Sequence, residues 1–282
     1  MGELPSKFLP ADFDKSAKIA ILAGKGMYPS ILKSKLDALG IANALMAFEG
    51  ETSPELWAQF ADSERACANV GQLGHLLKNL KKVGARYAMM AGQITPKKLF
   101  KGMKPDLKAI LVLATLKRKN AETIFGAIAD QLGKIGVDML DARSFLDDSL
   151  APLGSFCGGA PKVPNEQIEY AMTIARECAR LDIGQGCVVS RGTVLAVEAF
   201  EGTDAMLERA GTFGAKDCIF AKTVKPNQDY RFDVPVIGER TIRKLAAADI
   251  RNVVVEAEKV IILDKQNVKK LAAENGIKIF GI

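Results

Sequence analysis

The N-terminal half of the chain alternates short apolar runs with stretches that repeat apolar residues at helical spacing. Four runs have the length and apolar character of buried strands: 19–23, 42–48, 87–91 and 137–140. The helical stretches are 30–39, 54–60, 73–83, 107–116 and 121–132. Strands that alternate with helices predict a parallel sheet with helices on both faces, so we expect a Rossmann-like domain over residues 18–139.

The C-terminal half shows a different pattern, in which paired strands occur beside helices. Two β-rich runs around Arg191 and Gly192 predict a hairpin that ends at Glu198. Other strands are expected at 219–223, 253–256, 260–263 and 277–280, with the second and third of these flanking a tight turn. Helices are expected at 165–180, at 204–210, and from an N-cap at Asp264 to Asn275. The predicted fold class is therefore α/β, with a mixed α+β domain at 165–282 after the Rossmann-like domain.

Two further segments lack regular periodicity. Residues 1–17 are polar and rich in proline and aspartate, so a flexible tail is expected there. Residues 140–164 accumulate glycine, proline and serine, which is typical of a loop-rich connection between domains.

The composition is that of a globular protein, since 48% of the residues are apolar and 26% are charged. The longest apolar run, near 109–114, is far shorter than the roughly 20 residues of a spanning helix. No segment resembles an export signal, so a cytoplasmic protein is expected. The net charge of +6 fits an anionic ligand or an anionic membrane surface. Nucleic acid is not expected as a partner, because only 6% of the residues are aromatic and these are not interleaved with bases.

The chain has few residues for histidine or cysteine chemistry. The chain contains one histidine, His75, and five scattered cysteines without a Cys-x-x-Cys pair. A zinc site built from several histidines or from paired cysteines is therefore excluded. His75 lies among leucines of a predicted helix, where a structural role is the simpler interpretation. A catalytic base is then expected to be a carboxylate, and a bound metal ion to be a hard one with oxygen ligands.

A glycine-rich turn follows the first strand. The pattern Gly24-x-Gly26-x-x-Pro29 resembles a dinucleotide fingerprint with proline in place of the third glycine. Such a turn brings backbone N–H groups to a phosphate at a helix N-terminus, and Glu49 follows the second strand at about the distance of a ribose-binding acid. An anion site, an NAD site and a tight turn without a ligand all remain open here. Gln93, in the turn after the third strand, belongs to the same sheet edge.

Acids, bases and amides gather at strand ends and turns of the C-terminal half. Charges of both signs at turns suit a phosphate-bearing, metal-bound ligand. Asp182 and Gln185 occupy a glycine-bounded turn before the hairpin, and Glu201-Gly202-Thr203-Asp204 joins a strand to a helix. A plain turn is an equally open role for the first segment. For the second segment a capping role is open, since Thr203 or Asp204 would make a good helix N-cap.

The densest cluster of charges is Lys222-Thr223-Val224-Lys225-Pro226-Asn227-Gln228-Asp229, followed by Arg231-Phe232-Asp233. Lys222 and Asp233 fall in or beside apolar strand residues, where an unpaired charge is costly. We therefore favour a functional role over a structural one. A carboxylate near two lysines is suited to orienting water or binding Mg²⁺.

Three C-terminal runs resemble those of the UDP-2,3-diacylglucosamine pyrophosphatases of lipid A synthesis, of the two-domain type that is distinct from the calcineurin-like metallophosphatase. They are Leu181-Asp182-Ile183-Gly184-Gln185, the run 197–205, and Lys225-Pro226-Asn227-Gln228-Asp229-Tyr230-Arg231-Phe232-Asp233-Val234-Pro235. Residues 23–29 and 91–94 are weaker counterparts, and the similarity extends from about Lys18 to the C-terminus. After Ile94 the family commonly carries Arg-Pro, where this chain has Thr95-Pro96-Lys97-Lys98.

The resemblance implies a hydrolase in which water attacks the α-phosphorus of the UDP group and releases UMP and 2,3-diacylglucosamine 1-phosphate. It implies dependence on Mg²⁺, with Mn²⁺ or Co²⁺ as alternatives, and a homodimer. The substrate would be a lipid-linked UDP-sugar, which places the protein at the cytoplasmic face of the inner membrane as a peripheral protein. No segment of the sequence stands out as an amphipathic anchor. Asp233 corresponds to the aspartate that the family needs for turnover.

The other site residues are predicted from their chemistry and position in a C-terminal catalytic domain. Lys222 and Lys225 are expected to be catalytic together with Asp233, and Glu201, Asp204 and Asp233 to bind the metal ion. Substrate contacts are expected from Gly24, Gly26, Gln93, Asp182, Gln185, Thr203, Gln228, Asp229 and Arg231. Two other classes remain open: a nucleotide-sugar or lipid-binding protein without turnover, and an NAD-dependent oxidoreductase that uses the Rossmann-like half.

Overall fold

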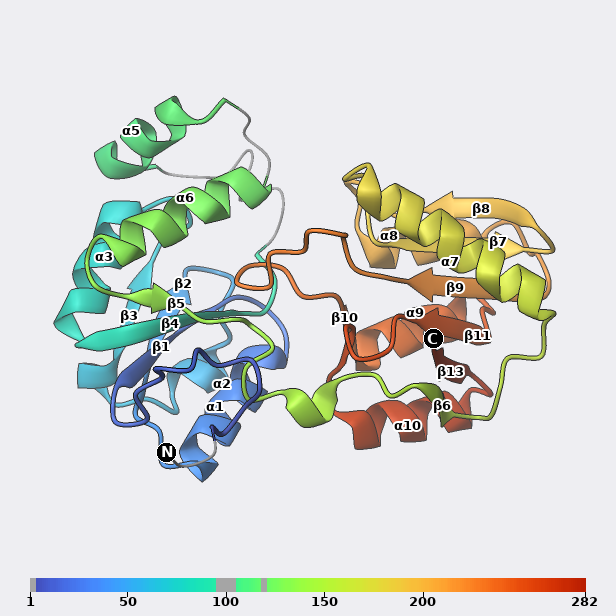
Figure 1. Ribbon diagram of the computed structural model, residues 1–282, viewed down its shortest axis with the longest axis horizontal. Helices are drawn as coiled ribbons and strands as arrows, with labels where there is room; N and C mark the ends of the chain where they lie inside the picture. The colour runs from blue at the N-terminus through green and yellow to red at the C-terminus, as the bar shows by residue number, and fades with distance from the viewer. Residues whose placement is uncertain (1–3, 95–104, 118–120) are drawn as a thin grey trace. The chain divides into compact units, whose positions relative to one another are not determined.

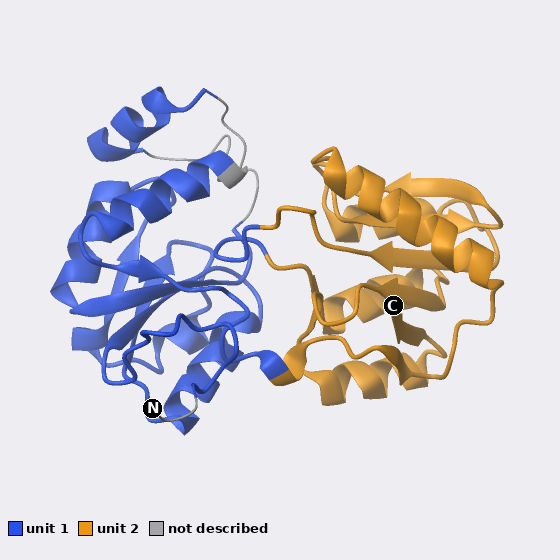
Figure 2. Cartoon of the chain, viewed as in Figure 1, with its two compact units in different colours: residues 1–147, 229–233 blue, residues 148–228, 234–282 orange. Residues whose placement is uncertain are grey.

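A computed structural model describes residues 4–94, 105–117 and 121–282. The chain divides into two compact units, coloured separately in Figure 2. Unit 1 comprises Met1–Asp147 and Asp229–Asp233, and unit 2 comprises Asp148–Gln228 and Val234–Ile282. A short segment of the C-terminal half therefore belongs to the N-terminal unit. Residues 95–98, where the sequence departs from the family's Arg-Pro, lie outside the described residues.

Unit 1 contains a five-stranded sheet whose strands are all parallel (Figure 1). In spatial order the strands are β3 (Arg65–Ala68), β2 (Asn43–Phe48), β1 (Lys18–Ala23), β4 (Ala85–Ala91) and β5 (Asp138–Met139). This order, with the first strand in the middle and the chain continuing to either side, is the Rossmann-like arrangement and confirms the predicted fold class. Strand β3 was not predicted, because only its last residue is buried and its apolar pattern is weak.

Helices cover both faces of this sheet, as Figure 1 shows. They are α1 (Tyr28–Ala38), α2 (Pro54–Trp57), α3 (Leu73–Lys82) and α6 (Ala121–Gly133), with a 3₁₀ turn η1 (Asp62–Glu64), while α5 (Leu107–Thr115) packs on α3. Side chains of β1 alternate between the faces, and Ala20 and Leu22 share a buried cluster with Leu76 and Leu80 of α3. The predicted strand–helix alternation thus reflects a two-sided core.

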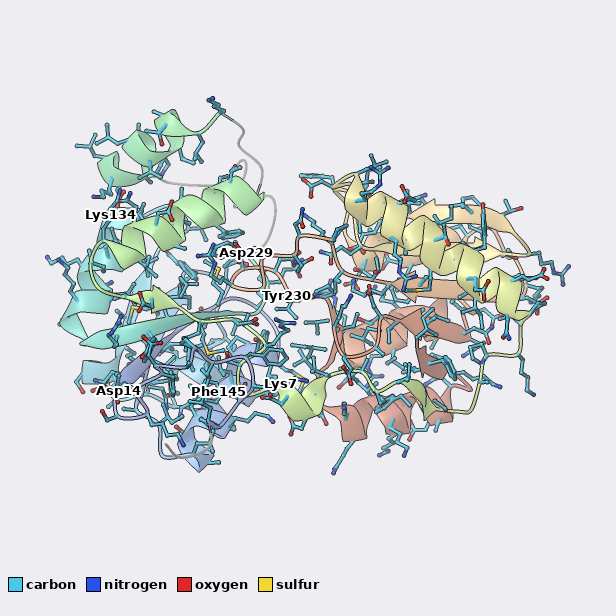
Figure 3. The ribbon with its side chains drawn as sticks, in the orientation of Figure 1. Lys7, Asp14, Lys134, Phe145, Asp229 and Tyr230 are labelled. Atoms are coloured by element: carbon cyan, nitrogen blue, oxygen red, sulfur yellow. The ribbon has the colours of Figure 1, made fainter. Side chains whose placement is uncertain are left out.

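Residues 4–17 contain neither helix nor strand, yet they pack against unit 1. Leu9 and Phe13 are buried, and the rings of Phe13 and Tyr87 have centroids 4.9 Å apart. The amide of Asp14, labelled in Figure 3, donates a hydrogen bond to the Tyr87 hydroxyl at 3.0 Å. The expectation of a flexible tail is wrong for these residues, because two apolar side chains anchor an otherwise polar segment.

Unit 2 contains a six-stranded mixed sheet. In spatial order its strands are β6 (Gly154–Cys157), β13 (Lys278–Gly281), β11 (Asn252–Val255), β9 (Cys218–Lys222), β7 (Gly186–Ser190) and β8 (Thr193–Val197). Strands β7 and β8 form the predicted antiparallel hairpin. Arg191 and Gly192 at its turn both have positive φ, 47° and 79°, as a tight two-residue hairpin connection requires.

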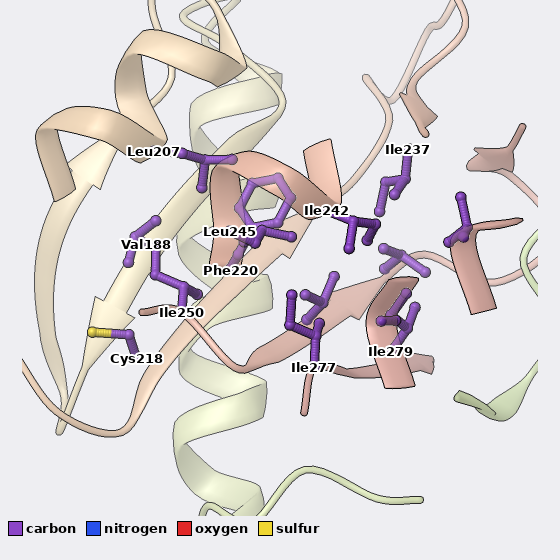
Figure 4. Packing of buried hydrophobic residues seen from close by; sticks show 14 of the residues in the cluster. Val188, Leu207, Cys218, Phe220, Ile237, Ile242, Leu245, Ile250, Ile277 and Ile279 are labelled. Carbon is purple, nitrogen blue, oxygen red and sulfur yellow. The ribbon is translucent and has the colours of Figure 1, made fainter. Parts of the chain in front are cut away.

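The helices of unit 2 lie on both faces of its sheet. They are α7 (Asn165–Arg180), α8 (Thr203–Gly211), α9 (Glu239–Ala247) and α10 (Lys265–Glu274), with a 3₁₀ turn η2 (Asp147–Ser149) at the start of the unit. Helix α7 packs on one face through Ala171, Met172 and Ala175. The other face carries a larger core, drawn in Figure 4, around Phe220, Ile242 and Leu245. Mixed α and β structure in this half was predicted correctly.

The two strands expected at 253–256 and 260–263 lie in different sheets. Strand β11 belongs to the six-stranded sheet, while β12 (Ile261–Ile262) pairs in parallel with β10 (Val236–Ile237). The amide of Ile261 donates to the carbonyl of Pro235 at 2.9 Å, which draws this strand toward a distant part of the chain. The sequence of these two short apolar runs does not indicate which strands they pair with.

Candidate functional site

A buried lysine lies at the carboxyl end of β9. Lys222 is only 6% exposed, and its Nζ donates a hydrogen bond to the Thr203 hydroxyl at 3.0 Å. That hydroxyl donates in turn to Glu198 Oε1 at 2.7 Å, and Glu198 Oε2 lies 3.6 Å from the lysine Nζ. We call these three side chains the Lys222 cluster. A buried ammonium with a hydroxyl and a carboxylate around it satisfies the expectation that a charge here needs partners.

Glycines make room for the Lys222 cluster. A side chain at Gly184 would collide with the carbonyl of Glu198, and a Cβ at Gly186 would lie 2.8 Å from Glu198 Oε2. Gly202, with φ of 82°, is the N-cap of α8, so Thr203 is the first helical residue rather than the cap. The capping alternative for Thr203 is therefore wrong, and its hydroxyl serves the lysine and the glutamate instead.

Other predicted residues of unit 2 gather beside this cluster. The amide of Thr223 donates to the carbonyl of Gln185 at 2.9 Å. Lys225 forms an ion pair with Asp182, and its amide donates to Gln228 Oε1 at 3.0 Å. The structure therefore brings Asp182, Gln185, Lys225 and Gln228 to the strand end that carries Lys222.

Glu256 is a further carboxylate at this edge, in the residue after β11. It accepts a hydrogen bond from the Thr223 hydroxyl, and Lys259 Nζ lies 2.6 Å from its Oε1. Burial opposes ionisation of this carboxyl, but hydrogen bonds from Lys259 and Thr223 outweigh it and lower its pKa below the ordinary value. Glu256 is therefore ionised next to the strand end.

Two of the predicted metal ligands have arginine partners. Glu201 lies 2.7 Å from Arg209, whose hydrogen bond lowers the pKa of the Glu201 carboxyl. Asp204 forms an ion pair with Arg240. Across residues 4–94, 105–117 and 121–282, no group of three or more histidine, cysteine, aspartate or glutamate side chains could hold a metal ion. Within unit 2, Glu201 and Asp204 are thus each paired with an arginine.

In unit 1 the glycine turn after β1 pairs with the turn after β4. The amides of Gly24 and Lys25 donate to the carbonyls of Ala91 and Gln93, both at 2.8 Å. A Cβ at Gly24 would lie 2.6 Å from the Gln93 carbonyl oxygen, so the close approach requires glycine. Because these two amides already have acceptors, an anion at this turn would use the amides that follow, from Gly26 onward at the start of α1.

The segment 229–233, here called the 229–233 loop, belongs to unit 1. Asp229 and Arg231 form a two-pronged ion pair with distances of 2.9 and 2.7 Å, which lowers the pKa of the Asp229 carboxyl. Figure 3 labels Asp229 and Tyr230 in this loop. Asp233 is exposed at its end. The burial argument made from the sequence is therefore correct for Lys222 and wrong for Asp233, which follows a turn instead of lying within a strand.

The 229–233 loop is fixed to unit 1 by stacking and by a backbone hydrogen bond. The guanidinium of Arg143 lies 3.4 Å from the centroid of the Tyr230 ring, and also 4.2 Å from that of Phe8. The amide of Ala142 donates to the Tyr230 carbonyl at 2.8 Å. The rings of Phe232 and Phe125 stack with centroids 6.1 Å apart. Arg143 thereby links the loop that carries Asp233 to the N-terminal unit.

Sequence reasoning missed Glu198, Glu256 and Arg143. Glu198 follows an apolar strand, as Lys222 ends one, and this shared feature was a usable signal. Glu256 likewise follows a strand that consists of asparagine and three valines. Arg143 lies in the glycine- and proline-rich connection, and its aromatic partner is far along the chain, so no local pattern identifies it.

These features define a two-domain α/β protein whose first unit is Rossmann-like and whose second unit carries a buried lysine cluster at the carboxyl end of a central strand. Residues 18–149 match the LpxI N-terminal domain and residues 154–280 match the LpxI C-terminal domain. The chain belongs to the LpxI family. One relative is the UDP-2,3-diacylglucosamine pyrophosphatase LpxI of Caulobacter vibrioides. It is 32% identical over 278 residues, which cover 94% of this chain and 97% of the relative. The resemblance noted from the sequence is confirmed.

Proposed function

We propose that this protein hydrolyses the pyrophosphate bond of UDP-2,3-diacylglucosamine in lipid A biosynthesis. Water attacks the α-phosphorus, and the products are UMP and 2,3-diacylglucosamine 1-phosphate. Membership in the LpxI family and the name of the Caulobacter relative support this reaction. The structural observation that supports it best is the Lys222 cluster, a buried cation with fixed partners at a strand end.

The charges at this strand end suit a pyrophosphate. Lys222 and Lys225 bind the pyrophosphate and neutralise its negative charge, since positioning and charge neutralisation are the main contributions of protein groups to phosphoryl transfer. Glu198 and Thr203 hold the Lys222 ammonium in one position. Asp182 does the same for Lys225. Fixed cations lower the cost of reorganisation during the reaction.

Asp233 orients or activates the attacking water. It corresponds to the family's essential aspartate, and its exposure leaves the carboxylate accessible to solvent. We assign Mg²⁺, with Mn²⁺ or Co²⁺ as substitutes, to Asp233 together with the substrate phosphates. Such a site fits, because Mg²⁺ commonly takes only one or two carboxylates plus phosphate oxygens. When bound, the ion would supply further positive charge to the pyrophosphate.

The lipid character of the substrate calls for work at a membrane. We propose that the protein is peripheral to the inner membrane at its cytoplasmic face, and that it is a homodimer. Within the described part of the chain, no helix is both long enough and apolar enough to cross a bilayer. Sedimentation velocity of the purified chain tests the dimer, which predicts one species of twice the 30.3 kDa chain mass.

The reaction is tested by UMP release from UDP-2,3-diacylglucosamine in detergent micelles with Mg²⁺, in ¹⁸O-water. We expect release by the wild type, loss of release after chelation or in Asp233→Ala, and the label in UMP. Label in the lipid phosphate would keep the reaction and overturn the site of attack. A folded wild-type protein that binds the substrate without releasing UMP would overturn the proposed function in favour of a binding protein.

A further inference from the structure

Helix α5 presents an apolar face to its surroundings. Leu107, Ile110 and Leu111 are 73%, 50% and 60% exposed, and their spacing of i, i+3 and i+4 places them on one side of the helix. On the opposite side Ala109 is buried, and Val112 packs against the core under α3. A helix that is apolar on both sides is normally covered on both. Three large exposed side chains on one face therefore point to a surface with a partner.

The orientation of this face is fixed by the start of α5. Asp106 is the N-cap, and its Oδ1 accepts a hydrogen bond from the Ala109 amide at 2.9 Å. Its Oδ2 accepts another from the amide of Gly74, at the start of α3, at 2.7 Å. The same carboxylate therefore starts one helix and ties it to the next. Figure 1 shows α5 beyond α3 and α6, on the side away from the sheet of unit 1.

Positive charge is concentrated in this part of the chain. Residues 97–119 contain eight of the 39 basic residues and one of the 33 acidic residues, Asp106, so the remainder of the chain is close to neutral. Among the described residues, Lys108 and Lys117 are exposed on α5 and just after it. Helix α3 adds exposed Lys78, Lys81 and Lys82 and carries no acid in its sequence. The apolar face thus lies on a helix that carries exposed cations and that contacts another helix with exposed cations.

We infer that the α5 face, made of Leu107, Ile110 and Leu111, docks into the surface of an anionic lipid bilayer. The apolar side chains enter the boundary between headgroups and acyl chains, and lysines such as Lys108 and Lys117 contact lipid phosphates. The choice of a membrane rests on the proposed function, whose substrate is a lipid. A second copy of this chain fits less well, because pairing two such faces would bring their lysines together. The anchor that the sequence pattern did not reveal is therefore assigned to α5.

Binding to vesicles tests this surface without using substrate or activity. The full chain is incubated with vesicles of phosphatidylethanolamine and phosphatidylglycerol, and with vesicles of phosphatidylcholine alone, and bound protein is measured by flotation. We expect binding to the anionic vesicles that weakens with salt. Leu107→Gln/Ile110→Gln/Leu111→Gln should weaken it by at least about tenfold, because the variant removes most of the insertable apolar area.

A matched control removes exposed apolar residues elsewhere. Leu39, Leu153 and Phe213 are 50%, 77% and 56% exposed, and changing all three to Gln should leave vesicle binding at the wild-type level. Circular dichroism and melting temperature confirm that both variants fold. No binding by the wild type, or equal binding by the α5 variant, would overturn the inference. So would a lipid-free wild-type dimer that the α5 variant dissociates, since a second copy would then be the partner.

Discussion

The Lys222 cluster of unit 2 and the 229–233 loop of unit 1 hold their charged groups in opposite ways. Lys222 is buried, and its ammonium is fixed by Glu198, which follows β8, and by Thr203, the first residue of α8. Asp233 is exposed, and its loop is fixed from outside by Arg143, Phe125 and the backbone of Ala142. In the Lys222 cluster the charged group itself is held in place, whereas in the 229–233 loop the backbone that carries the charged side chain is held.

This difference suits different tasks in hydrolysis. A buried, paired cation is already oriented before substrate arrives, so it provides a constant field for a phosphate. An exposed carboxylate on a fixed loop has access to water and to a metal ion. The comparison therefore predicts that the Lys222 cluster contributes mainly to binding of the pyrophosphate, and the 229–233 loop mainly to turnover.

The largest effect is expected from Asp233→Asn. This change keeps the size of the side chain but removes the carboxylate that handles water, so kcat should fall by about 10²- to 10⁴-fold while KM changes little. Steady-state UMP release checks this. Asp217→Asn, at an exposed carboxylate paired with Arg191, is the control and should retain full activity. A rise in KM at unchanged kcat would assign Asp233 to binding instead.

Glu198→Gln should have the next largest effect, and on two quantities. It removes the negative charge beside Lys222 while retaining an oxygen for the Thr203 hydroxyl, which destabilises unit 2 by about 1–3 kcal/mol and lowers kcat/KM by about tenfold. Urea unfolding and kinetics measure the two effects. Glu208→Gln, on the exposed pair with Lys244, should change neither. A wild-type value of kcat/KM in Glu198→Gln would show that Glu198 does not position Lys222 for the reaction.

Arg143→Lys should reduce kcat several-fold. Lysine keeps the charge but loses the planar stacking on Tyr230 and the two-pronged contact with Asp141. Hydrogen exchange of residues 229–233 should become faster, a change that a general loss of stability in unit 1 would spread over the whole sheet. Arg86→Lys is matched, since Arg86 stacks on Tyr87 and pairs with Asp138 away from the loop. Unchanged exchange in Arg143→Lys would show that Arg143 does not hold the loop.

The smallest effect concerns acid stability. The hydrogen bonds of Arg231 lower the pKa of Asp229 in the folded protein, so this pair stabilises the fold above the ordinary aspartate pKa of about 4 and loses that contribution as pH falls through the folded value. Asp229→Asn should therefore lose less thermal stability than the wild type between pH 6 and pH 3, by about 2 °C. Equal losses in both proteins would mean that the pair does not stabilise the loop.

The sequence was sufficient where a local pattern determines the structure. The Rossmann-like sheet followed from buried strands and intervening helices, and Lys222 was recognised because a charge inside an apolar strand needs partners. Helix α9 escaped notice, since its sequence is dominated by polar residues and only Thr241, Ile242 and Leu245 are buried. Arg143 escaped for another reason: its partner Tyr230 is distant in sequence, and stacking between them leaves no periodic signal. Contacts between segments that are distant in sequence therefore could not be predicted from the local pattern.

The most direct test of the division between binding and turnover is substrate affinity in a protein that cannot turn over. UDP-2,3-diacylglucosamine is titrated into Asp233→Asn and into Asp233→Asn/Lys222→Met, and the two dissociation constants are compared by calorimetry in detergent. We predict tight binding by the single variant and at least about tenfold weaker binding by the double variant, because a buried cation contact to phosphate is lost. Equal affinities, or loss of binding in Asp233→Asn alone, would contradict the account.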